Sequence, residues 1–410
     1  MACDPDNNAP PDQARLVSLL VSFSVVLIIA VAISAVAKRT IVSTTVLFLI
    51  AGFVLGSGVT GVIALAPDDP IVNTISEIAL FTVLFTDGQQ IGARDLRHAW
   101  RLPGRALLFG LPLTLAISAV LGVWLLGLSW PQALLIAAVL APTDPVFASA
   151  IVGRKEIPTR TRSLLNVESG LNDGLALPLV LVFLAVASGQ ETDLWTLAGE
   201  LLLGIALGVV IPVMVRLLFA LPFITATPLY ATLTPVAVGL LTFGLAHQLD
   251  GNLYLAAFSS GITIASIAPQ TRDAFHEFGE LLSELVKLLA ILVFGALISP
   301  AILGDVGVLG YAFAVLLLVL ARPLAVEVAL VRSGLDRWER LTVAWFGPKG
   351  FASVLYGLLV LDSAVPNADM LFHVIVVAVV LSIVAHSSTD VPIADAFGRR
   401  SEREELALQR

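Results

Sequence analysis

Apolar segments long enough to cross a lipid bilayer recur along this chain of 410 residues. A transmembrane helix needs about 20 predominantly apolar residues, whereas a water-soluble chain would alternate apolar and polar residues with the period of a helix or a strand. The sequence therefore predicts an all-α polytopic membrane protein with about thirteen transmembrane helices. The thirteen segments lie at about 16–37, 41–65, 71–87, 105–127, 131–152, 162–187, 194–217, 228–248, 253–268, 279–299, 306–331, 340–361 and 370–387.

The segments follow one another closely, which predicts a single membrane domain over residues 1–410. The cytoplasmic tail expected at 388–410 is too short for a nucleotide-binding or regulatory domain, and the first segment is too long for the core of a signal peptide. Only 13% of the residues are charged while 58% are apolar, and the single Cys3 excludes an internal disulfide. We expect a lipid bilayer as a partner, no cofactor and no nucleic acid.

Positively charged loop residues predict which side of the membrane each end of the chain occupies, because cytoplasmic loops collect Lys and Arg. With the N-terminus outside and the C-terminus inside, nineteen Lys and Arg residues fall in cytoplasmic loops and only Arg15 falls outside. The outer loops are then acidic or neutral. We therefore expect this orientation, in the plasma membrane of a bacterium.

Two of the segments contain residues that interrupt a helix. Pro142 and Pro145 flank Thr143-Asp144 in the fifth segment, and Gly347-Pro348-Lys349-Gly350 interrupts the twelfth. Each proline removes a backbone donor, and lipid tolerates such a break only where the freed groups face protein, water or an ion. Asp144 and Lys349 can balance the charges of the half-helix ends at the two breaks. An offset of seven spans gives the two segments opposite directions, so we expect inverted repeats with two crossed discontinuous helices at a binding site.

The sixth segment carries oxygen-bearing side chains on one helical face. Ser169 and Asp173 are four residues apart and share a face, while Glu168 and Asn172 share the neighbouring one. Carboxylate and hydroxyl oxygens suit a hard cation, and no cluster of His and Cys points to a transition metal. A charge near the bilayer centre costs about 2.5–3.5 kcal/mol and usually serves to move ions or protons. Glu168 needs a buried cation, for which Arg322 in the eleventh segment is the best candidate.

The Thr-Asp-Pro-Val break, the Glu-Ser-Gly-Leu-Asn-Asp-Gly helix, the buried Arg and the Gly-Pro-Lys-Gly break together resemble the NhaP-type sodium/proton antiporters. These belong to the monovalent cation/proton antiporter-1 family, which includes the animal sodium/hydrogen exchangers. The resemblance extends over essentially all thirteen segments. It implies a homodimer in which a core bundle, approximately 71–187 and 279–387, moves like an elevator against interface helices at approximately 16–65 and 194–268. By motif position it implies an ion- and proton-binding set of Asp173, Asp144, Thr143 and Ser169, supported by Asn172, Glu168, Arg322 and Lys349.

The resemblance also implies the reaction. A carboxylate that holds either a proton or a cation makes an exchanger, and Asp173 is the expected switching group. Asn172 beside it is typical of members that exchange one cation for one proton, without net movement of charge. We expect Na+ as the transported cation, with Li+ as a second substrate, and a K+/H+ antiporter on the same scaffold is the alternative. A passive cation channel and an intramembrane aspartyl protease are more remote alternatives.

Two positions depart from the pattern of the family. Many members carry Glu where this chain has Asp87, so Asp87 is either an ion contact or a residue at the cytoplasmic end of the third helix. Many members also carry Arg where this chain has Lys349, and a compact ammonium does not replace a planar guanidinium in every respect.

A stripe of acidic residues at the start of the tenth segment has two interpretations. It consists of Glu277, Glu280 and Glu284, followed by Lys287. It is either an acidic funnel for ions or a set of acidic residues at a helix N-terminus with a Glu284–Lys287 pair, and the sequence favours the second.

Overall fold

The structure is a computed structural model that describes residues 12–37, 44–90, 102–144, 157–189, 194–224 and 227–408. Within these ranges the chain is helical apart from its connections and one isolated bridge between Gly56 and Ile63. The polar backbone groups of a helix bond to one another within the helix. This is the solution that a lipid environment imposes on the long apolar segments of the sequence.

Eight of the described helices, two of them built from shorter helices joined by a π-helical turn, are long and apolar enough to cross a membrane. They are α1 (Asp12–Ala37), α3 (Pro70–Gln90), α5 (Pro103–Arg105) continuing through η1 (Ala106–Gly110) into α6 (Leu111–Leu126), α9 (Thr159–Ala187), α10 (Leu194–Phe219), α11 (Pro228–Gln248), α15 (Gly307–Leu316) continuing through η3 (Leu317–Ala321) into α16 (Arg322–Ala329), and α19 (Ala368–Leu408). Four shorter apolar helices are α2 (Thr44–Leu55), α7 (Trp130–Val139), α12 (Leu253–Ile267) and α18 (Phe351–Leu361). The remaining described helices are α13 (Pro269–Leu297), α14 (Pro300–Asp305) and α17 (Arg337–Trp345).

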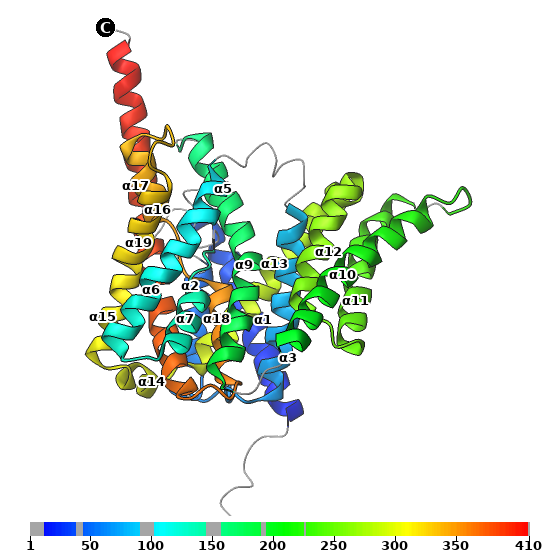
Figure 1. The fold of residues 1–410 in the computed structure, drawn as a ribbon, viewed down its shortest axis with the longest axis horizontal. Helices are drawn as coiled ribbons and strands as arrows, with labels where there is room; N and C mark the ends of the chain where they lie inside the picture. Colours follow the sequence, from blue (N-terminus) through cyan, green and yellow to red (C-terminus); the bar gives the residue numbers. More distant parts are fainter. Residues whose placement is uncertain are drawn as a thin grey trace, which may run out of the picture.

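Each of the thirteen predicted segments overlaps a described helix or a pair of helices, and the all-α membrane architecture is confirmed. Length and hydropathy support eight crossings directly, so the number thirteen stays a prediction. In Figure 1, α10, α11 and α12 gather on one side of the molecule, and α6, α15 and α19 stand on the other. The helix α1 starts at one end of this array and α19 ends beyond the opposite end, as an odd number of crossings requires.

The boundaries of α2 and α13 differ from those predicted. The helix α2 ends at Leu55 rather than near 65, because the chain turns back after Gly56 and the N–H of Ile63 bonds to the carbonyl of Leu55 at 2.7 Å. The turn includes Gly61 with φ of 72°, a left-handed conformation that glycine adopts readily. The helix α13 begins at Pro269, ten residues before the predicted 279, since proline is favoured in the first turn of a helix.

The helix α19 continues through most of the residues that were predicted to form a tail from 388 onward. Its extension carries a buried stripe of Asp390, Ala394 and Phe397 at helical spacing. Ala394 and Phe397 belong to a hydrophobic cluster that includes Leu164 of α9 and Leu335. The helix therefore persists because one of its faces is covered by the rest of the protein.

Small residues bring α3 against α12. A Cβ atom on Gly261 would overlap the backbone of Phe85, and one on Gly88 would overlap the backbone of Phe258. Small residues permit such an approach of two helices in a membrane protein, where apolar side chains gain little by leaving lipid. The helix α3 also packs against α9, α13 and α18, so its last turns lie where these helices and the two interruptions meet.

Candidate cation-binding site

The first interruption follows α7 directly. Ser129 and Gln132 form a capping box at the start of α7, and the helix ends at Val139. Residues 141–144 are not helical, and the carbonyl of Ala141 accepts a hydrogen bond from Lys349 Nζ at 3.2 Å. Lys349 is completely buried, and its ammonium also reaches the carbonyl of Pro142 at 3.4 Å. Lys349 thus supplies the positive charge that was expected at the C-terminal end of this half-helix. Pro145, the second proline of the motif, lies outside the described residues.

The second interruption, Phe346–Gly350, joins α17 to α18 and contacts the first one directly. The N–H of Asp144 donates to the carbonyl of Pro348 at 2.9 Å, and Asp144 Oδ2 accepts from the N–H of Phe351 at 3.3 Å. The carboxylate of Asp144 therefore lies at the N-terminal end of α18, where the helix dipole favours negative charge. A Cβ atom on Gly350 would overlap this carboxylate, so glycine is required for the approach.

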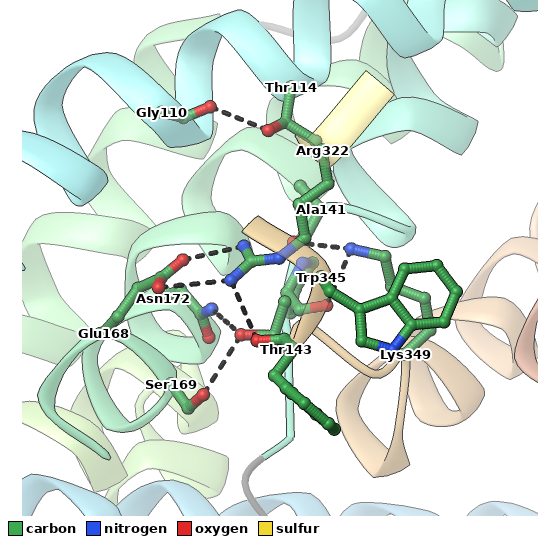
Figure 2. A network of polar contacts seen from close by, with 12 residues as sticks. Gly110, Thr114, Ala141, Thr143, Glu168, Ser169, Asn172, Arg322, Trp345 and Lys349 are labelled. Carbon is green, nitrogen blue, oxygen red and sulfur yellow. Dashed lines mark hydrogen bonds and ion pairs between the residues drawn. The ribbon is translucent and has the colours of Figure 1, made fainter. Parts of the chain in front are cut away.

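Hydroxyl and amide groups link the first interruption to α9. Thr143 Oγ1 lies 3.1 Å from Ser169 Oγ and accepts a hydrogen bond from Asn172 Nδ2 at 2.6 Å. Figure 2 shows these three side chains in one continuous chain of contacts. Asp173 follows one residue later and is 6% exposed. Its Oδ1 atom is buried and has no hydrogen-bond partner in the described part of the chain, which leaves it open to a proton or a cation.

The three aspartates line one cavity of about 610 Å³. Asp87 comes from the last turn of α3, Asp144 from the first interruption and Asp173 from α9. The helix α13 supplies the opposite wall. The cavity holds six carboxylates and one ammonium, and its charged lining is Asp87, Asp144, Asp173, Glu277, Glu280, Glu284 and Lys287. Such an excess of negative charge in a partly enclosed space attracts cations.

The cavity and the helix boundaries show where the acidic residues of the two open questions lie. Asp87 is a residue of the last helical turn of α3 and also lines the cavity, so its position at a helix end is confirmed and an ion contact stays a prediction. The interpretation of Glu277, Glu280 and Glu284 as residues of a helix N-terminus is wrong. The helix α13 begins at Pro269, and the three side chains lie beyond its first turn and line the cavity.

The ion pair expected between Glu168 and Arg322 is present. Arg322 Nη1 donates to Glu168 Oε1 at 2.7 Å and Nη2 donates to Oε2 at 3.2 Å, an arrangement visible in Figure 2. Nη2 also reaches the carbonyl of Phe346 at 3.3 Å. Both charged side chains are buried, and Arg322 follows the π-helical turn η3 that precedes Pro323. The pair thereby joins α9, α16 and the second interruption.

Sequence reasoning missed two features of this region. The fully buried Tyr356 of α18 donates its hydroxyl to the backbone carbonyl of Asp173 at 2.9 Å, and nothing in the sequence separates it from other aromatic residues of the core. Lys287 was expected to pair with Glu284, whereas it lies in the second half of α13 and lines the cavity. A signal for Lys287 was available, because a Lys next to the apolar run that starts at Leu288 is rare unless it has a function.

Comparison with known proteins agrees with the fold and the motifs. The family model described as sodium/hydrogen exchanger, transmembrane matches residues 25–395. The chain is 25% identical over 372 residues to a protein named K+/H+ antiporter NhaP2 from Shewanella baltica, covering 88% of this chain and 63% of that protein. It is also 25% identical over 378 residues to the K+/H+ antiporter NhaP of Alkalimonas amylolytica, covering 90% and 65% respectively. The chain thus spans less than two thirds of the length of these relatives.

A solved structure has a similar fold. It is that of the sodium proton antiporter MjNhaP1 from Methanocaldococcus jannaschii at pH 8, with a TM-score of 0.76 and 20% sequence identity over 93% of this chain and 98% of that one. The resemblance drawn from the motifs is therefore confirmed, and the alternative of an intramembrane protease is set aside. This chain belongs to the sodium/hydrogen exchanger family of multi-pass membrane proteins, whose members are transporters and not enzymes.

Proposed function

We propose that this protein is a secondary active antiporter that exchanges a monovalent cation for a proton across the plasma membrane of a bacterium. The observation that carries the proposal is the buried Oδ1 atom of Asp173, which accepts no hydrogen bond from the described residues although Ser169 lines the same cavity. A buried acceptor without a partner costs about 1–3 kcal/mol, and more if it is charged. Binding either a proton or a cation removes this cost, and the two exclude each other at one carboxylate.

The oxygen atoms around Asp173 suit a hard monovalent cation. Thr143, Ser169 and Asp144 offer hydroxyl and carboxylate oxygens, which hard cations prefer. Asp87 joins the cavity from α3 and is the fifth oxygen donor that we propose. Asn172 supports the site by fixing Thr143, and Lys349 and the Glu168–Arg322 pair hold the interruptions in place.

Asn172 also supports a ratio of one cation to one proton. Its amide carries no charge, so of the two adjacent positions 172 and 173 only Asp173 bears a carboxylate. Exchange of one proton for one monovalent cation at that carboxylate moves no net charge. Such exchange follows the two ion gradients and is indifferent to the membrane potential.

We propose that the site opens to one side of the membrane. Its rim is formed by the exposed Glu277 and Glu280 of α13 together with the exposed Gln90 at the end of α3, all of which line the cavity. With the N-terminus outside and the C-terminus inside, this rim faces the cytoplasm, so we propose an inward-open state. The acidic stripe would then concentrate cytoplasmic cations at the entrance.

Alternating access requires the site to meet the other side as well. We propose that a core bundle of about 71–187 and 279–387, with its two interrupted helices crossed as inverted repeats, moves like an elevator against helices of about 16–65 and 194–268. Exposed apolar side chains on α1 and α10, such as Val21 and Leu202, fit contact with lipid or with a second copy of the chain in a homodimer.

The identity of the cation is open to a direct test. We propose Na+, with Li+ as a second substrate, because the carboxylate and hydroxyl cluster suits a small hard ion. K+ is the second candidate, because the similar proteins of Shewanella baltica and Alkalimonas amylolytica are named K+/H+ antiporters. In proteoliposomes with an imposed pH gradient, Na+ and Li+ should each collapse the gradient at concentrations that leave it intact when K+ or choline is added. If K+ collapses the gradient at a lower concentration than Na+ and Li+, the protein exchanges K+ for protons instead. If none of these ions collapses the gradient, the protein is not an antiporter for them.

A further inference from the structure

Lys287 is a cationic residue inside a cavity that is otherwise built to hold cations. It shares one face of α13 with Glu280 and Glu284, at spacings of seven and three residues, and all three line the cavity with Asp173. A charged side chain within a predicted membrane-spanning segment is costly, and its persistence calls for a function.

The charges that surround Lys287 come from every wall of the cavity. Its electrostatic partners are Asp87 of α3, Asp144 of the first interruption, Glu284 of its own helix and Asp173 of α9. Three of these four are the aspartates that we assign to the transported cation. The side chain nevertheless forms neither a hydrogen bond nor an ion pair with any of the described residues. Its ammonium is stabilised by the combined negative charge of these four carboxylates rather than by a contact with one of them.

The other two cations of the core behave differently. Lys349 is fully buried and donates to the backbone carbonyls of Ala141 and Pro142, and Arg322 is bonded at both terminal nitrogens to Glu168. Both are therefore committed to fixed structural contacts. Lys287 is half-buried, and its four-carbon stem carries a compact ammonium that can change position within a cavity of about 610 Å³.

We propose that Lys287 is a tethered cation that competes with the transported cation for the aspartates of the site. The inference rests on the proposed function and adds a residue that sets the affinity of the site. When no cation is bound, the ammonium stays within electrostatic reach of Asp87, Asp144 and Asp173 and offsets their mutual repulsion. When a cation enters, the ammonium withdraws toward Glu284 on the adjoining turn of α13. The transported cation must therefore displace a charge of its own sign, which holds its affinity down.

The test compares the concentration of cation that gives half-maximal flux (KM) in wild-type protein and in Lys287→Met, reconstituted in proteoliposomes. Removing a positive charge from the lining of the same cavity should lower KM by about tenfold or more. Lys287→Arg keeps the charge and should keep KM within about threefold of wild type. Arg340→Met removes a positive charge on α17, away from the cavity, and should leave KM unchanged.

Two further measurements keep the outcome decisive. Thermal unfolding in detergent establishes that each variant is folded, and equilibrium binding of the cation to purified protein gives the affinity independently of the transport rate. If the wild type exchanges cations normally and folded Lys287→Met has the same KM as the wild type or a higher one, Lys287 is a structural countercharge. The inference is then overturned. Absence of exchange in the wild type itself would instead remove the proposed function.

Discussion

Asp173→Asn should reduce cation-driven collapse of a pH gradient to the level of protein-free liposomes. The amide nearly matches the carboxylate in shape, but it neither releases a proton near neutral pH nor offers a negative charge to a cation. Both halves of the exchange therefore fail at once, while the hydrogen bond between Tyr356 and the backbone carbonyl of Asp173 is retained. The measurement is the recovery of a pH-sensitive dye inside proteoliposomes after addition of Na+, Li+ or K+.

The matched control is Asp305→Asn. Asp305 is an exposed carboxylate at the end of α14 and does not line the cavity, so its replacement should leave the flux at the wild-type rate. Thermal unfolding of Asp173→Asn in detergent should show a folded protein, since the substitution removes a buried charge without creating a void. Flux that persists in Asp173→Asn would leave transport intact but would place the switching carboxylate elsewhere, with Asp144 the next candidate.

Arg322→Met should destabilise the protein by about 3–5 kcal/mol, because it leaves Glu168 buried without its partner. The guanidinium also bonds the carbonyl of Phe346, so the variant should loosen the second interruption as well. Combining Arg322→Met with Glu168→Gln removes both charges. The double variant should therefore be more stable than Arg322→Met alone, which is the sign of a coupled pair. The midpoint of thermal or denaturant unfolding in detergent measures both effects.

A neighbouring ion pair provides the control for the buried one. Glu327 Oε2 of α16 lies 3.6 Å from Arg340 Nε, and each side chain is about a third exposed. An exposed pair contributes about 0–1 kcal/mol, so Glu327→Gln should shift the unfolding midpoint far less than Arg322→Met. Equal midpoints for Arg322→Met and wild-type protein would show that the Glu168–Arg322 pair does not hold the site helices together.

The parts of the site that follow from local chemistry were predictable from the sequence. Proline at 142 and glycine at 347 and 350 mark where a helix cannot continue, and buried Glu168 demanded a cation that Arg322 could supply. The spacing of Ser169 and Asp173 predicted a shared helical face that points at Thr143 and Asp144. The ion-binding roles of these residues stay predictions, which the flux experiments test.

The parts that depend on how distant helices pack were not predictable in this way. The sequence placed Glu284 and Lys287 at the start of a helix, because the polar residues before 279 hid the true start of α13 at Pro269. The extension of α19 past 388 was missed for a similar reason. Its buried residues, such as Ala394, are recognisable only once the cluster that covers them is known. The contact of Tyr356 with Asp173 likewise depends on α18 meeting α9, which no local pattern encodes.

The central claim is that one carboxylate holds either a cation or a proton, so that the two ions cross the membrane one for one. The most direct test is to record cation and proton fluxes in the same proteoliposomes while the membrane potential is clamped and then varied. We predict one proton leaving for each cation that enters, at a rate set by the two ion gradients and unchanged by voltage. A flux that follows the voltage, or cation entry without proton exit, would contradict it.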